Sequence, residues 1–181
     1  MKITPGKIPG VLLIEPKVHA DERGFLFESF NRREFARQTG LALDFVQENH
    51  SRSAHHVLRG LHYQVRQSQG KLVRVVAGEV FDVAVDLRRE SPTFGQWCGH
   101  VLSQQNQHQL WIPPGFAHGF LVLSDGADVL YKCTRYYAPA DERCIVWNDP
   151  TLGIDWPLNG AAPVLSVKDM EGLALGAALA K

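Results

Sequence analysis

Residues 79–87 read EVFDVAVDL, and this stretch decides the fold class. Apolar side chains occupy every second position of it, and Asp82, Ala84 and Asp86 stand between them. Alternation with a period of two is typical of a β-strand. The same pattern recurs at residues 58–65, 71–76, 118–123 and 128–135. Turn-forming residues separate these segments, so the chain is predicted to be all-β, as a barrel or a sandwich of many short strands.

One helix is expected near the N-terminus. Asn31 suits its N-cap, Glu34 follows three residues later as in a capping box, and Gly40 suits the left-handed residue after the last turn. A second short helix is expected near Lys168. No repeat, low-complexity tract or linker interrupts the sequence, so we predict one domain over residues 1–181.

Charge and cysteine content narrow the function classes. The 181 residues contain 19 lysines and arginines and 19 aspartates and glutamates. Because the net charge is zero, the chain has no overall positive field that would favour binding to nucleic acid or anionic membranes. An anionic ligand therefore has to be bound by cations placed at its site. The 3 cysteines show no CxxC spacing, which argues against a disulfide framework and suits a cytoplasmic protein. No apolar stretch is long enough to predict a signal peptide or a membrane span.

Residues 57–64 read VLRGLHYQ and contain the main catalytic candidate, His62. In a regular strand Gly60 shares a face with His62 and leaves room for a ligand beside the ring. Arg59 lies on the opposite face of such a strand, so a bulge or a strand-end position has to turn it inward, or it serves a different part of the site. An isolated histidine of this kind is more often a core residue. Further candidates stand at or near the ends of predicted strands or in a loop: Lys71, His118, Tyr131 and Asp169. A base, an acid and a cation together suit the removal of a proton from a carbon next to a carbonyl group.

The same motif is followed by QGKLVRVVAGEVFDVAVDLRRESPTFGQW at residues 69–97 and by WIPPGFAHGF at residues 111–120. RGFLFESF at 23–30, NHSRS at 49–53, ERCIVWNDP at 142–150 and LSVKD at 165–169 accompany them. Together these motifs resemble the dTDP-4-dehydrorhamnose 3,5-epimerase family over nearly the whole chain. The resemblance implies a cupin-type jelly-roll barrel with a few short peripheral helices, a homodimer, and no cofactor or metal. It also implies epimerisation at C3 and C5 of dTDP-4-dehydro-6-deoxy-D-glucose, which gives dTDP-4-dehydro-L-rhamnose for dTDP-L-rhamnose biosynthesis.

The resemblance further implies a role for each catalytic candidate. His62 takes the proton from C3 or C5, and Asp169 binds the other ring nitrogen and raises the basicity of the imidazole. Tyr131 returns a proton at C5 from the opposite face of the sugar, and Lys71 lies near the C4 oxygen.

The implied substrate contacts combine cations for the diphosphate with polar and aromatic groups for the rest of the nucleotide sugar. The chain has neither a GxGxxG motif nor a P-loop, so side-chain cations have to hold the diphosphate. The contacts are Arg23, Phe25, Glu28, Gln47, Glu48, Asn49, Arg59, His118, Tyr137, Glu142 and Lys168.

Three alternatives stay open. A metal-dependent cupin isomerase or oxygenase usually needs two histidines at HxH spacing and a nearby carboxylate, but here Gln64 follows His62 and only His118 fits the later position. A sugar-binding cupin without activity needs no acid and base. An epimerase that inverts only C3 or only C5 is the third alternative, and it differs from a 3,5-epimerase in the position of its proton donor.

Overall fold

The computed structural model describes residues 1–178, which form thirteen strands and a few short helices. The strands are β1 (Lys2–Pro5), β2 (Leu12–Glu15), β3 (His19–Asp21), β4 (Gly24–Leu26), β5 (Gln47–Ala54), β6 (Leu58–Gln64), β7 (Lys71–Ala77), β8 (Glu79–Asp86), β9 (Trp97–Ser103), β10 (Gln109–Ile112), β11 (Phe116–Val122), β12 (Gly126–Cys133) and β13 (Glu142–Cys144). The helices are α1 (Arg32–Thr39), α2 (Val167–Met170) and α3 (Leu175–Ala178), with a 3-10 turn at Pro139–Asp141. None of the described helices is long and apolar enough to span a membrane.

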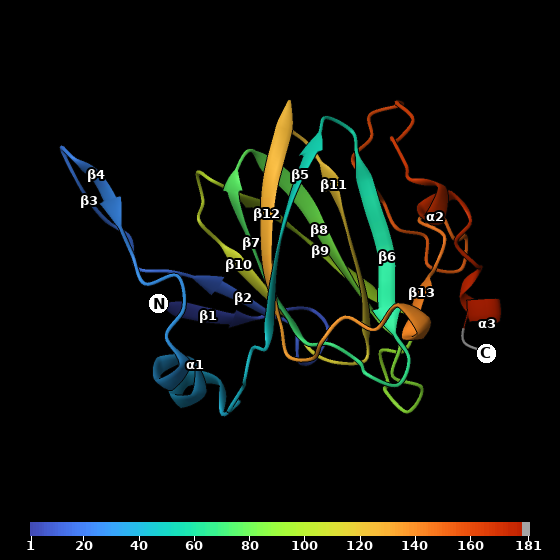
Figure 1. Ribbon diagram of the computed structural model, residues 1–181, viewed down its shortest axis with the longest axis horizontal. Helices are drawn as coiled ribbons and strands as arrows, with labels where there is room; N and C mark the ends of the chain where they lie inside the picture. Colours follow the sequence, from blue (N-terminus) through green and yellow to red (C-terminus); the bar gives the residue numbers. More distant parts are fainter. Residues whose placement is uncertain (179–181) are drawn as a thin grey trace.

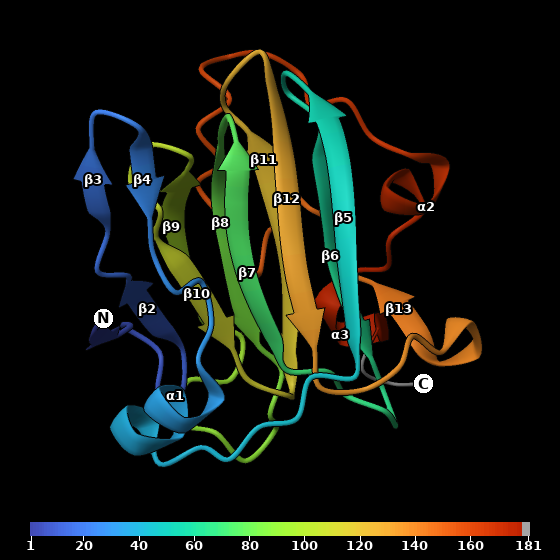
Figure 2. The same ribbon diagram turned by 60° about the vertical axis from the view of Figure 1, so that its left-hand side comes forward.

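Two antiparallel sheets face each other and enclose the core (Figures 1 and 2). The larger sheet has the strand order β1-β2-β10-β7-β12-β5, and the smaller one has the order β13-β6-β11-β8-β9. This arrangement confirms the predicted jelly-roll barrel with short peripheral helices. That all of residues 1–181 form a single domain stays a prediction, because residues 179–181 lie outside the described part of the chain.

The five alternating segments of the sequence become β6, β7, β8, β11 and β12, within two residues of the expected bounds. The expected N-terminal helix is α1, where Asn31 accepts a hydrogen bond from the backbone of Glu34 and Gly40 adopts a left-handed conformation. The capping box is only half formed, because the side chain of Glu34 pairs with Arg37 instead of returning to Asn31. The helix expected near Lys168 is α2.

Strand β8 is buried on both faces, which explains its position in the middle of the fold. Val80 and Ala84 belong to the core between the two sheets. Val83 and Val85 pack instead against the C-terminal segment, which covers the outer face of the smaller sheet (Figure 1). The two aspartates of β8 are therefore fully buried.

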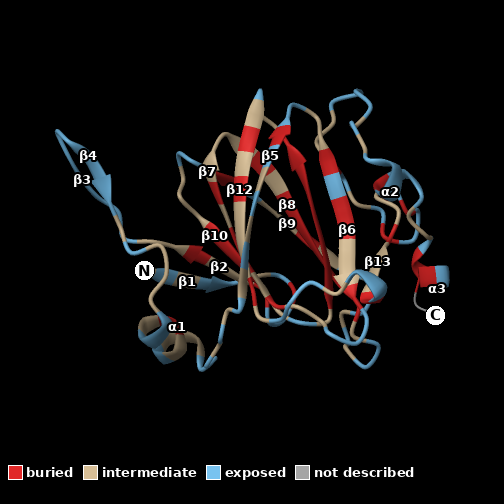
Figure 3. Cartoon of the chain, viewed as in Figure 1, coloured by how far each residue is buried: buried red, intermediate tan, exposed pale blue. Residues whose placement is uncertain are grey.

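A hairpin of β3 and β4 projects away from the two sheets and is exposed along its length (Figure 3). Its apolar residues Phe25 and Leu26 are 61% and 76% exposed. Large apolar side chains that gather on an exposed projection indicate an interaction surface.

A bulge in β6 determines which side chains face the interior. His62 pairs with His118 of β11 and Arg59 pairs with Phe120, so β6 contains one residue more than β11 between these pairs. The extra residue brings Arg59 and His62 to the same face. A bulge of this kind is what the sequence pattern required for Arg59 to face inward. The peptide bond between Gly60 and Leu61 is cis.

Gly60 has a different role from the one expected of it. Its φ is 119°, and a Cβ atom at this position would lie 2.6 Å from the Cα of Gly119 on β11. The glycine therefore allows two strands to approach each other, and the space beside it is filled by backbone, not available to a ligand.

We expect Gly60→Ala to destabilise the protein by about 2–5 kcal/mol, because overpacking adds to the cost of a positive φ. Gly24→Ala is the matched control, since Gly24 has a φ of 120° and a Cβ atom added to it would meet no other atom within 4 Å. Urea unfolding of both variants measures the difference. Equal stability of Gly60→Ala and the parent protein would contradict the close approach of β6 and β11.

Candidate active site

A cavity of about 170 Å³ lies between the sheets, lined from both sides. The larger sheet contributes residues of β5, β7 and β12, and the smaller sheet contributes residues of β6 and β11. The lining residues are Ser51, Arg59, His62, Lys71, His118, Gly119, Phe120 and Tyr131. Five of the predicted site residues thus line one space, with His62 and Tyr131 on opposite sheets.

His62 and Asp169 form a hydrogen-bonded pair. The Nε2 atom of His62 lies 2.6 Å from Oδ1 of Asp169, although 107 residues separate them in the sequence. Asp169 is held in turn by Ser166, whose hydroxyl donates to Oδ2 at 2.6 Å, and by the backbone N–H of Gly60, which donates to Oδ1 at 3.1 Å. Burial alone raises the pKa of Asp169, but the bonds from His62 and Ser166 outweigh it and hold this pKa at about 2. The carboxylate therefore stays ionised beside the imidazole.

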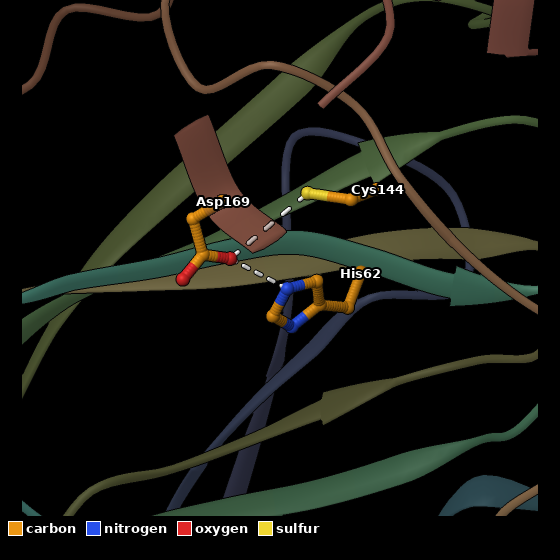
Figure 4. A group of neighbouring side chains, drawn as sticks. All are labelled: His62, Cys144 and Asp169. Atoms are coloured by element: carbon orange, nitrogen blue, oxygen red, sulfur yellow. Dashed lines mark hydrogen bonds and ion pairs between the residues drawn. The ribbon is translucent and has the colours of Figure 1, made fainter. Parts of the chain in front are cut away.

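The geometry of this pair leaves one ring nitrogen of His62 free for chemistry. Figure 4 shows the Nε2 atom turned to Asp169 and the Nδ1 atom on the far side of the ring. With a proton on Nε2 directed at the carboxylate, Nδ1 carries the lone pair. The side chain of His62 is 26% exposed whereas that of Asp169 is 4% exposed, so only the imidazole is accessible.

Cys144 completes a group of three atoms that a metal ion could use. Its sulfur, Nε2 of His62 and a carboxylate oxygen of Asp169 lie within 4.8 Å of one another (Figure 4). The donors fit a metal poorly, because both oxygens of Asp169 already accept hydrogen bonds. Burial also raises the pKa of the Cys144 thiol to about 12, which disfavours the thiolate that metals bind. That the site works without metal stays a prediction, which elemental analysis of the pure protein tests.

Lys71 and His118 lie at the same cavity and share a buried acidic neighbour. The Nε2 atom of His118 is 2.9 Å from Oδ2 of Asp82, and neither side chain is more than 6% exposed. Burial lowers the pKa of Lys71, and the nearby Cys133 and Asp82 oppose this shift. A partly desolvated ammonium group next to a cavity is suited to stabilise a developing negative charge.

Tyr131 faces the cavity from the middle of β12. Burial raises the pKa of its phenol, so the hydroxyl is protonated at neutral pH and available as a proton donor. Its ring centroid is 6.4 Å from that of His118. The phenol and the imidazole of His62 line one cavity, as the acid–base hypothesis requires.

Four further predicted residues form a connected polar rim. The backbone N–H of Tyr137 donates to Oε1 of Gln47 at 2.8 Å, and the Tyr137 hydroxyl donates to Glu142 at 2.6 Å. Glu142 also forms an ion pair with Lys168. Burial raises the pKa of Glu142, but Lys168 and Tyr137 outweigh it and lower this pKa overall. Glu142 lies on β13 two residues before Cys144, which pairs with His62, so the rim lies beside the cavity.

Asn49 and Arg59 are held by neighbouring side chains of the same region. The side chain of Gln47 donates to Asn49 at 2.9 Å, and Asn49 in turn contacts the sulfur of Cys133. The Nε atom of Arg59 donates to the hydroxyl of Ser53 at 2.9 Å, which leaves its remaining N–H groups for a ligand.

The structure does not bring the other four predicted residues to the cavity of the same chain. Arg23 and Phe25 lie on the projecting hairpin, where Arg23 pairs with Asp21. Glu28 follows the hairpin and accepts a hydrogen bond from Asn31 at 3.0 Å. Glu48 points to the outer face of β5 and pairs with Lys132 at 3.0 Å. Glu48 is therefore an outward-facing strand residue, not a lining residue of this cavity.

The residues of the site that the sequence interpretation missed include Asp82, Ser166 and Ser51. Asp82 could have been found, since a carboxylate among apolar residues of a strand indicates a buried partner. Ser166 stands three residues before Asp169 and forms the N-cap of α2, which is a readable pattern. Ser51 lies in a polar segment that gives no signal of its own.

The ionised Asp169 makes the protein sensitive to acid. Folding lowers its pKa from 3.8 to about 2, so it stabilises the fold above the unfolded value and loses this contribution as the pH falls through the folded value. We expect the free energy of unfolding of the parent protein to fall as the pH is lowered from about 4 to 2. In Asp169→Asn the decrease over the same range is expected to be smaller by about 2 kcal/mol. Urea unfolding across this pH range measures it, and an equal fall in both proteins would contradict the pairing.

Comparison with known proteins connects this geometry to one family. Residues 5–176 match the family model described as dTDP-4-dehydrorhamnose 3,5-epimerase. The dTDP-4-dehydrorhamnose 3,5-epimerase of Pseudomonas aeruginosa is 64% identical over 174 residues, which cover 96% of each chain. A dTDP-6-deoxy-D-glucose-3,5-epimerase from Legionella pneumophila, solved in complex with dTDP-4-keto-L-rhamnose, is 55% identical with a TM-score of 0.94, over 97% of this chain and 93% of that one.

A more distant solved structure, a 3′-monoepimerase from Streptomyces bikiniensis in complex with dTDP-quinovose, is 35% identical with a TM-score of 0.91, over 97% of this chain and 89% of that one. The higher identities are to the 3,5-epimerases. The predicted resemblance and the predicted fold are thus both confirmed. The chain belongs to the dTDP-4-dehydrorhamnose 3,5-epimerase family.

Proposed function

We propose that this enzyme epimerises dTDP-4-dehydro-6-deoxy-D-glucose at C3 and C5 and so forms dTDP-4-dehydro-L-rhamnose. The observation that carries the proposal is the shared cavity, which the carboxylate-held His62 and the partly buried phenol of Tyr131 line from opposite sheets. Membership of the family supports the substrate.

The reaction follows from the positions of four side chains. His62 Nδ1 takes the proton from C3 or C5, the electron pair of the C–H bond moves toward the carbonyl, and the C4 oxygen becomes negative. Lys71 stabilises this oxygen, and Asp169 stabilises the imidazolium ion. At C5, Tyr131 donates a proton to the opposite face of the carbon, which inverts it, and proton transfer from His62 to the phenolate restores both groups. At C3, a water molecule donates the proton to the opposite face, and the hydroxide that remains takes the proton from His62.

Exchange with deuterated water tests the proposal. The enzyme is incubated with the 4-keto sugar nucleotide in D₂O, and NMR follows the label at each carbon. We expect deuterium at both C3 and C5. Label at C3 alone would support a single-centre epimerase, and no enzyme-dependent label at all would identify a binding protein.

Arg59 is proposed to bind the diphosphate, because its guanidinium is fixed by Ser53 and faces the cavity. We expect Arg59→Ala to weaken binding of dTDP roughly 10- to 100-fold, with a smaller effect on kcat. Arg52→Ala is the control, since Arg52 lies on the outer face of β5 and pairs with Asp128. Calorimetry with dTDP compares them, and a loss confined to kcat would contradict this role.

The rim of Gln47, Tyr137, Glu142 and Lys168 is proposed to receive the rest of the nucleotide. The ring of Tyr137 is 49% exposed, so thymine can stack on it. Lys168 adds a second cation near the diphosphate once Glu142 releases it. Asn49 and His118 supply further polar contacts from the cavity side.

A homodimer is proposed from the projecting hairpin. Packing against a second copy would cover Phe25 and Leu26 and carry Arg23, Phe25 and Glu28 toward the site of the neighbouring chain. Light scattering tests this, with Phe25→Ser/Leu26→Ser expected to lower the mass from that of two chains to that of one. A parent protein that already has the mass of one chain would contradict the dimer.

The three cysteines of the described residues are free, and a reducing cytoplasm is the compartment that we propose. Cell fractionation of an epitope-tagged protein tests this location. Recovery of the protein in the secreted fraction or inside a membrane-bounded compartment outside the cytoplasm would contradict it.

A further inference from the structure

Asp169 lies on a short helix that apolar packing does not hold in place. Among the four residues of α2, only Asp169 is buried, and the apolar side chains of Val167 and Met170 are exposed. Apolar burial therefore contributes little to the position of this helix. The orientation of the Asp169 carboxylate depends instead on its hydrogen bonds.

The two oxygens of this carboxylate are held by different groups. Oδ1 accepts hydrogen bonds from Nε2 of His62 at 2.6 Å and from the backbone N–H of Gly60 at 3.1 Å, and the thiol of Cys144 lies 3.9 Å from it. Oδ2 accepts from the hydroxyl of Ser166 at 2.6 Å, which is its only donor among residues 1–178. Because a carboxylate rotates as a unit, the bond at Oδ2 determines the plane in which Oδ1 meets the imidazole.

Ser166 contacts the main chain and the side chain of Asp169 at the same time. Its oxygen accepts a hydrogen bond from the backbone N–H of Asp169 at 3.2 Å while its hydroxyl donates to Oδ2. In a capping box the acidic side chain returns to the backbone N–H of the N-cap residue. Here the carboxylate accepts from the hydroxyl itself, so the serine can orient the carboxylate as well as begin the helix.

We propose that Ser166 is a positioning residue whose hydroxyl holds the Asp169 carboxylate in the orientation that keeps the proton of His62 on Nε2. This inference rests on the proposed function, in which Nδ1 of His62 takes the proton from the sugar. A neutral imidazole carries one proton, on either ring nitrogen. A carboxylate that faces Nε2 favours the proton there and leaves the lone pair on Nδ1. A carboxylate that turns away allows the tautomer with the proton on Nδ1, which cannot act as the base.

Three substitutions of one residue separate this role from helix capping. Ser166→Thr keeps both the hydroxyl and the cap, Ser166→Gly keeps a tolerated N-cap without the hydroxyl, and Ser166→Ala loses both. We expect kcat/KM for exchange at C3 and C5 to fall roughly 10- to 100-fold in the glycine and alanine variants alike. Ser166→Thr is expected to retain most of the activity. Since glycine is tolerated at an N-cap, Ser166→Gly supplies the measurement if Ser166→Ala does not fold.

The tautomer of His62 is a readout that a capping role alone would not change. NMR of enzyme labelled at the imidazole nitrogens, at a pH at which the ring is neutral, identifies the nitrogen that carries the proton. The signal absent from His62→Asn belongs to this residue. We expect the proton on Nε2 in the parent protein and in Ser166→Thr, and a measurable share of the form with the proton on Nδ1 in Ser166→Gly and Ser166→Ala.

A double variant tests whether the serine acts through the carboxylate. In an Asp169→Asn background, Ser166→Gly is expected to change kcat/KM by no more than about twofold. Parent-like exchange by Ser166→Gly, an unchanged tautomer of His62 in that variant, or additive losses in the double variant would each overturn the inference. The proposed function survives these results as long as the parent protein exchanges both C3 and C5 and His62→Asn does not.

Discussion

Replacement of His62 by asparagine is expected to abolish deuterium incorporation at both C3 and C5. Asparagine keeps a polar side chain of similar reach that can still bond to Asp169, but its amide cannot accept a proton at neutral pH. Since one imidazole is proposed to serve both carbons, both exchange reactions are lost together. Removal of a general base typically costs about 10²–10⁴-fold. The other imidazole at the cavity, that of His118, is bound to Asp82 through Nε2 and is proposed only as a substrate contact.

His55→Asn is the control for this variant. His55 lies in an exposed turn, where its ring stacks on that of His56 at a centroid distance of 3.8 Å, away from the cavity residues. We expect parent-like exchange from the control and native thermal stability from both variants. A folded His62→Asn enzyme that loses less than about tenfold in rate would contradict the role of base.

Replacement of Tyr131 by phenylalanine is expected to separate the two epimerisations. The ring remains in place and only the phenolic hydroxyl is lost, so the proton needed at the opposite face of C5 has no donor. We expect inversion at C5 to fall about 10²–10⁴-fold while exchange at C3 persists, so that the product accumulates with C5 unchanged. NMR of the product identifies the configuration of each centre.

Tyr136→Phe is the matched control for the second experiment. Tyr136 lies on the same connection after β12 and is 65% exposed, so loss of its hydroxyl is expected to change neither rate nor product. If Tyr131→Phe forms the doubly inverted product at the parent rate, the proton donor at C5 is a different group. The presence of Tyr131 then does not distinguish a 3,5-epimerase from a single-centre epimerase.

The regular parts of the fold could be predicted from local pattern. The alternating segments indicated β6, β7, β8, β11 and β12, and Asn31 with Gly40 indicated α1, because each of these signals depends on neighbouring residues alone. Strand β5 showed no such signal, since its sequence QENHSRSA is polar on both faces. One face meets the solvent and the other meets the polar cavity, so neither is apolar.

The site itself depends on contacts that no local pattern records. Asp169 reaches His62 across 107 residues, and only the resemblance to a family suggested that pair. The bulge that turns Arg59 inward comes from the register between β6 and β11, which two separate segments determine together. Arg23 and Phe25 lie on the exposed hairpin, and their proposed role depends on contact with a second chain. A local pattern in one sequence does not record such a contact.

The central claim is that the imidazole of His62 and the phenol of Tyr131 act on opposite faces of one sugar ring. A crystal structure of the catalytically inactive His62→Asn enzyme with the dTDP-linked 4-keto sugar measures this directly. We predict the side chain at residue 62 on one face of C5 and the Tyr131 oxygen on the other, each about 3–3.5 Å from the carbon. A sugar bound with both groups on the same face, or outside the cavity between β6 and β12, would contradict it.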